Sequence, residues 1–97
     1  MHIPDEFLYL VRCFHQDIDR EASNEGELVT VLLEFLDADQ GAAVHSFLAG
    51  LLSRNPSGAE LQQMWRDCDP DWSIRRDEDL RHFLTTIRDR LSPEAIR

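Results

Sequence analysis

Residues 79–91 read DLRHFLTTIRDRL, and the spacing of their apolar side chains indicates the fold. Apolar residues recur there at intervals of three and four, at Leu80, Phe83, Leu84, Ile87 and Leu91. An α-helix turns once in about 3.6 residues, so this spacing places the apolar side chains on one helical face. A serine and a proline follow the last leucine and end the pattern.

The same spacing recurs in four earlier segments. The first covers about residues 5–16, after Pro4. The apolar positions of the four segments are Phe7, Leu10, Val11 and Phe14; Leu28, Val31, Leu32, Phe35 and Leu36; Ala42, Val44, Phe47, Leu48, Leu51 and Leu52; and Leu61, Met64, Trp65 and Cys68. No segment shows sustained alternation of the kind that predicts a strand.

Breaks between the segments separate the predicted helices. The stretches DREASNEGE, DADQG and DPDWSIRR interrupt the apolar spacing, and Pro56 ends the third helix because the residue before a proline is pushed out of the helical region. Ser57 and Glu60 have the spacing of a capping box. The sequence therefore predicts an all-α protein, a single domain over residues 1–97 that forms a compact bundle of about five amphipathic helices.

Composition limits the class of protein. With 97 residues the chain is large enough for one core, and its 42% hydrophobic and 30% charged residues are ordinary for a globular protein. No apolar run approaches the roughly 20 residues of a membrane span, and the start MHIPDEF has no leader pattern. We therefore expect a cytoplasmic protein with no membrane partner, in which Cys13 and Cys68 remain thiols.

The charge is strongly negative and unevenly distributed. Nineteen acids against ten arginines and no lysine give a net charge of -9. Residues 16–39 hold eight acids and one arginine, and residues 67–79 hold a second acidic run. Such a chain is repelled by phosphate backbones and by anionic lipid, so we expect no direct nucleic-acid binding. A basic protein is the partner that this charge favours.

The candidate partner-facing residues lie in these two acidic runs. Trp72 joins them because an aromatic side chain in an acidic loop can anchor an interface, although it can equally cap the core. The predicted set is Asp17, Asp19, Glu21, Glu25, Glu27, Asp69, Asp71 and Trp72.

Patterns of enzymes are missing from the sequence. The stretch CFHQDID places Cys13 and His15 two residues apart on a helix, where they point in different directions and form no local dyad. There is no nucleophile elbow and no Gly-rich phosphate loop. A zinc site would require distant histidines to meet across the fold. We therefore expect no enzymatic activity, no cofactor and no metal centre.

Calcium binding at residues 67–78 is the alternative of a different class. The stretch DCDPDWSIRRDE places Asp67, Asp69 and Asp71 at positions one, three and five of an EF-hand loop, and Glu78 at position twelve. Against this, proline, tryptophan and arginine occupy positions four, six and nine, where the sixth needs a glycine. A third alternative is an acidic adaptor for another basic protein.

Two short motifs carry a resemblance to a known family. Phe14, His15, Gln16 and Asp17 form the stretch FHQD at the end of the first predicted helix, and Asp69 and Pro70 precede the last one. In both respects the chain resembles the small immunity proteins of bacterial contact-dependent growth inhibition systems. Their FHQD-like stretch is usually followed by tryptophan, which Ile18 replaces here.

The resemblance implies a function that agrees with the charge. Proteins of this family bind and neutralise a toxin domain delivered by a neighbouring cell, commonly a nuclease. Nucleases bind phosphate backbones and are usually basic, so an acidic inhibitor suits them. Interface residues do not transfer from the family, because the surfaces of immunity proteins differ with the toxin.

Overall fold

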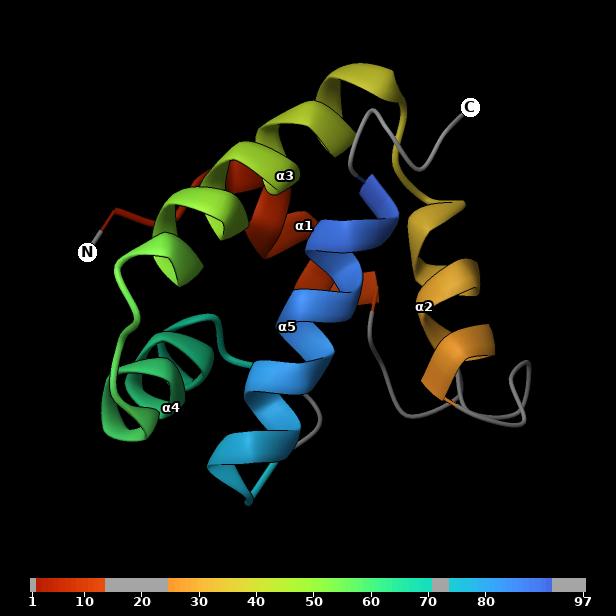
Figure 1. The fold of residues 1–97 in the computed structure, drawn as a ribbon. Coiled ribbons are helices and arrows are strands. Elements are labelled where there is room, and N and C mark those ends of the chain that lie inside the picture. The colour runs from red at the N-terminus through yellow and green to blue at the C-terminus, as the bar shows by residue number, and fades with distance from the viewer. Residues whose placement is uncertain (1, 14–24, 71–73, 92–97) are drawn as a thin grey trace.

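Five helices make up most of the chain that the structure describes. The structure is a computed structural model that describes residues 2–13, 25–70 and 74–91 (Figure 1). Its helices are α1 (Asp5–Cys13), α2 (Glu25–Leu33), α3 (Ala38–Ser53), α4 (Gly58–Asp67) and α5 (Asp77–Leu91). No described residue lies in a strand, and the Cα radius of gyration is 12.5 Å. The prediction of a compact all-α protein is confirmed.

Helix α5 occupies the middle of the arrangement. It contacts α3 and α4 most extensively and also contacts α2, while α1 packs against α3 and α2. Figure 1 shows α2 and α4 on opposite sides of α5. The side chain of Arg81 reaches from α5 to the carbonyl of Pro56, which lies in the connection between α3 and α4. Helix α5 therefore connects α2, α3 and α4.

Most of the core consists of the apolar faces that the spacing predicts, with the differences that Val29, outside the predicted pattern, is buried and Ala42, inside it, is exposed. Its buried residues are Phe7, Leu10, Val11, Val29, Leu32, Val44, Leu48, Leu51, Leu61, Met64, Trp65, Cys68, Leu80, Phe83, Leu84 and Ile87. The rings of Trp65 and Phe83 meet edge to face with centroids 6.0 Å apart, which joins α4 to α5. Burial of each large side chain contributes about 1.5–3 kcal/mol. Phe14, predicted for the same core, lies outside the described residues.

Phe35 does not join this core, and the prediction that it would is wrong. Its side chain is 44% exposed. Helix α2 ends at Leu33, and the next residues form tight turns in which the Phe35 N–H donates to the Leu32 carbonyl at 3.1 Å. In this i→i+3 geometry side chains do not follow the period of 3.6 residues on which the prediction relied.

Capping boxes begin two of the helices. At α4 the Glu60 N–H donates to Ser57 Oγ at 3.2 Å and the Ser57 N–H to Glu60 Oε1 at 3.5 Å, as the sequence predicts. A second box at α3 joins Asp37 and Gln40. The stretch DADQG is therefore mostly the first turn of α3, and reading it only as an interruption missed this signal.

We expect Gly58→Ala to destabilise the protein by about 1–3 kcal/mol, because the added methyl group overlaps a neighbour. A Cβ at Gly58 would lie 2.7 Å from the Cβ of Asp77, the first residue of α5. Gly50→Ala is the matched control, since a Cβ there meets nothing within 4 Å. On an exposed helix it should stabilise by about 0.5–1 kcal/mol. Urea unfolding of both variants tests this prediction. Equal changes in the free energy of unfolding would contradict the predicted overlap.

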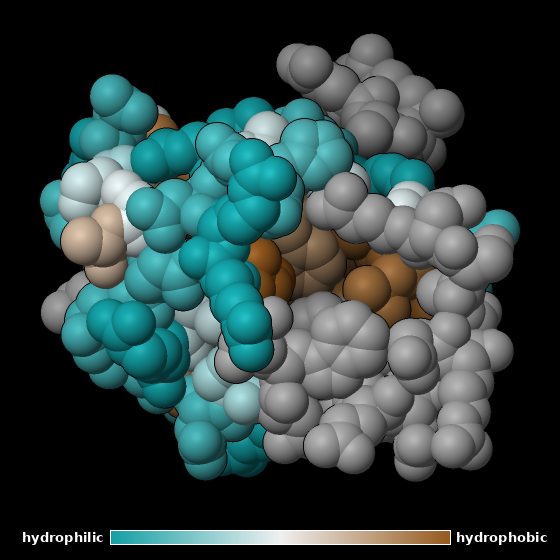
Figure 2. Space-filling view, turned by 90° about the horizontal axis from the view of Figure 1, so that it is seen from below, coloured by the Kyte–Doolittle hydropathy of each residue, from teal (hydrophilic) through white to brown (hydrophobic). Residues whose placement is uncertain are grey.

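Among the described residues, those on the surface at the end where α5 begins are mostly hydrophilic. Figure 2 shows it from below, with hydrophobic residues visible between the hydrophilic side chains and the residues drawn in grey. Among the described helices, none combines the length and the apolar character needed to cross a bilayer.

Candidate functional site

The structure describes only part of the predicted partner-facing set. Glu25 is the first residue of α2, Glu27 is exposed on the same helix, and Asp69 is exposed directly after α4. Because α2 and α4 flank α5 from opposite sides, Glu27 and Asp69 are not brought together (Figure 1). The other predicted residues lie outside the described ranges: Asp17, Asp19, Glu21, Asp71 and Trp72.

The connection between α2 and α3, together with the first turn of α3, carries three exposed acids close in sequence to an exposed aromatic side chain. We define the acidic turn as Glu34, Phe35, Asp37 and Asp39, all of which are exposed. Residues 25–44 contain no arginine, lysine or histidine. The ion pairs found among the described residues, such as Arg88 with Asp89 at 2.9 Å, do not involve the acidic turn. Within the described ranges, the carboxylates of the acidic turn therefore have no basic ion-pair partner.

Asp37 is held firmly by the start of α3. Its Oδ1 atom accepts a hydrogen bond from the Gln40 N–H at 2.8 Å, and its own N–H donates to Gln40 Oε1 at 3.0 Å. Asp39 lies in the first turn of the same helix, where the partial positive charge of the helix end favours carboxylates. The Asp37 carboxylate is thus ordered at a helix end, so it would lose little side-chain freedom in a contact with another molecule.

Tyr9, on α1, is a second exposed aromatic side chain. It is 41% exposed, and it and Phe35 are the two large hydrophobic side chains exposed among the described residues. The pKa of the Tyr9 phenol is raised by the charge of Cys13 first, then by desolvation and a hydrogen bond to Cys13, and also by the charge of Asp37. Tyr9 therefore lies within electrostatic reach of the acidic turn.

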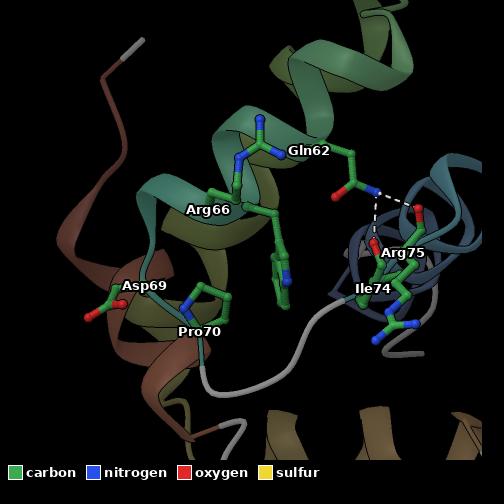
Figure 3. A pocket seen from close by; sticks show the side chains of 7 residues that line it. Gln62, Arg66, Asp69, Pro70, Ile74 and Arg75 are labelled. Atoms are coloured by element: carbon green, nitrogen blue, oxygen red, sulfur yellow. Dashed lines mark hydrogen bonds between the residues drawn. The ribbon is translucent and has the colours of Figure 1, made fainter.

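A second surface feature, a pocket of about 510 Å³, lies between α4 and the start of α5. Its lining consists of Gln62, Trp65, Arg66, Asp69, Pro70, Ile74 and Arg75. Gln62 Nε2 donates to the carbonyls of Ile74 at 2.7 Å and Arg75 at 3.4 Å, which ties this connection to α4 (Figure 3). The charged residues of this lining are two arginines and one aspartate, so the described lining of the pocket is not acidic.

The described ligands of the calcium alternative are engaged elsewhere. Asp67 Oδ1 accepts a hydrogen bond from Gln63 Nε2 at 2.8 Å, and Glu78 pairs with Arg76. Asp69 has a φ of 53°, the left-handed conformation that commonly follows a helix end, and thereby terminates α4. Within the described ranges, which omit Asp71, no three His, Cys, Asp or Glu side chains group as metal ligands. No observation here favours the calcium alternative.

Cys68 is the buried residue that caps the C-terminal end of α4, and we expect its thiol to make the stability of the protein depend on pH in the alkaline range. Burial, with a contribution from the Asp67 carboxylate, raises the pKa of the Cys68 thiol from 9.0 to about 11. Between these values the unfolded state loses the proton while the folded state keeps it, so stability falls as the pH rises through this window. Across this pH window the free energy of unfolding should fall by about 2 kcal/mol.

Urea unfolding on both sides of that pH window tests this prediction. The variant Cys68→Ala should lose less stability across the window than the parent protein, because the other titrating groups are common to both. An identical fall in both proteins would contradict the assignment to Cys68.

Comparison of the chain with protein families, with characterised proteins and with solved structures finds no match.

Proposed function

We propose that this protein is an immunity protein that binds and neutralises the toxin domain of a contact-dependent growth inhibition system. The toxin domain that we propose is a basic nuclease. The acidic turn is the observation that carries the proposal. It combines three exposed acids with an exposed phenylalanine, and its carboxylates have no basic partner among the described residues. The FHQD resemblance, at residues outside the described ranges, supports the same function.

Electrostatics explain how the inhibitor would find its partner. A domain that binds nucleic acid presents a basic surface, and an acidic surface of an inhibitor attracts it over a distance of about one Debye length. Such steering raises association rates by about 10- to 1,000-fold. Rapid capture matters because a nuclease damages the cell from the moment it enters. Covering its nucleic-acid cleft requires no catalysis by the inhibitor.

Phe35 would supply binding affinity that charged residues alone do not provide. Exposed ion pairs contribute little to affinity, whereas an aromatic ring that becomes buried in a partner contributes a large share. A ring that is 44% exposed in the free protein has apolar area left to bury. Exposed acids next to an exposed aromatic side chain also match the composition of protein interfaces, which have an apolar centre and a polar rim.

Co-expression tests this proposal. The probe is the C-terminal domain of the protein encoded immediately upstream on the chromosome. We expect that domain to stop growth when expressed alone, to be harmless when this protein is co-expressed, and to co-purify with it. No association at low salt, together with undiminished toxicity, would contradict the proposal.

A further inference from the structure

A groove of about 440 Å³ lies beside the acidic turn, between the end of α2, the first half of α3 and the end of α5. Most of its walls are apolar, formed by Leu33, Leu36, Ala38, Ala42 and Leu91. Gly41 also lines it, and a Cβ at that position would lie 3.3 Å from Leu91 Cδ2. The last residue of α5 therefore closes one side of the groove against the α3 backbone.

The charged rim of the groove is acidic. Asp37 lines the groove itself, and exposed Asp39 follows the lining residue Ala38. No arginine of the described ranges lines it, and Arg90, next to the lining residue Leu91, donates to Thr30 Oγ1 on α2 at 2.9 Å. His45 and Ser46 supply the remaining polar lining. The groove therefore offers an apolar interior next to fixed negative charge.

We infer that this groove receives an apolar side chain of the toxin domain that lies next to a lysine or arginine. The inference rests on the proposed function and names the chemistry that the groove recognises. The apolar side chain would be buried against Leu36 and Leu91, while the neighbouring cation meets Asp37 and Asp39.

Charge complementarity selects this occupant over a second copy of the chain. A symmetric dimer formed through this face would bring the same acids of both copies together, in a protein that already carries a net charge of -9. A basic partner relieves that repulsion, and an apolar side chain inside the groove excludes water from the ion pairs at the rim.

The inference can be tested with a substitution that places a large side chain in the groove. Ala42 is exposed and lines the groove, so Ala42→Trp occupies the space without disturbing the core. We expect its affinity for the upstream-encoded domain to fall by about tenfold or more, measured by calorimetry with a catalytically inactive form of that domain. Ala42→Leu should give a smaller loss. The matched control is Ala59→Trp, at an exposed position of α4 outside the groove, which should bind like the parent protein.

Each outcome separates this inference from the proposed function. Loss of affinity in Ala42→Trp alone, with an unchanged melting temperature, supports the groove. If Ala42→Trp binds like the parent, or both tryptophan variants lose affinity equally, the groove inference is wrong and the proposed function stands. If the parent protein does not bind the domain, the groove inference and the proposed function are both wrong.

Discussion

Replacing Phe35 with alanine is expected to weaken binding of the toxin domain by about 30-fold or more, which corresponds to about 2 kcal/mol. The ring is 44% exposed and lies between Glu34 and Asp37, so its truncation removes apolar contact with the partner. Fold stability should change by no more than about 0.5 kcal/mol, because the side chain is not part of the core. Calorimetry and thermal unfolding measure the two effects separately.

Two further variants make this result specific. Phe35→Tyr keeps the ring and should retain most of the affinity. Gly50→Ala alters an exposed position toward the other end of α3 and should leave binding unchanged. An alanine variant at position 35 that binds as tightly as the parent would remove Phe35 from the interface.

Neutralising the acids of the acidic turn is expected to have the second large effect, on the rate of association with the toxin domain. The triple variant Glu34→Gln, Asp37→Asn, Asp39→Asn should associate with the toxin domain about tenfold more slowly, because the local field that steers the partner is lost. Asparagine caps a helix as well as aspartate does, so the start of α3 should be preserved. Stopped-flow association kinetics at low salt measure the rate.

A matched triple variant separates local charge from net charge. Asp67→Asn, Glu78→Gln, Asp79→Asn also removes three carboxylates, from the second acidic run. It should slow association much less than the triple variant of the acidic turn. Equal slowing by both would show that net charge, and not this surface, guides the encounter.

The fold could be predicted because one physical signal controls it. Apolar residues at helical spacing must be buried together, and this identified the helices and most of their buried faces, including Leu80, Leu84 and Ile87 of α5. The capping box at Ser57 and Glu60 was found for the same reason, since it depends on local spacing alone. Which helix lies in the middle depends on tertiary contacts that no local pattern encodes.

The candidate site was harder to predict because it depends on where helices end. Phe35 fits an apolar stripe only if α2 continues, and the helix ends two residues before it. The capping-box spacing of Asp37 and Gln40 is a sequence signal that α3 begins there, and α2 must therefore end before residue 37. Charge alone places Asp69 in the predicted partner-facing set, whereas its position after α4 gives it the structural role of ending that helix.

The most direct test of the central claim is the association rate constant of the parent protein with the toxin domain, measured as a function of salt. If the acidic turn captures a basic surface, the rate should fall by about tenfold between about 0.05 and 0.5 M salt, while dissociation changes much less. The triple variant of the turn should show a shallower dependence. An association rate for the parent protein that stays constant across this range would contradict the claim.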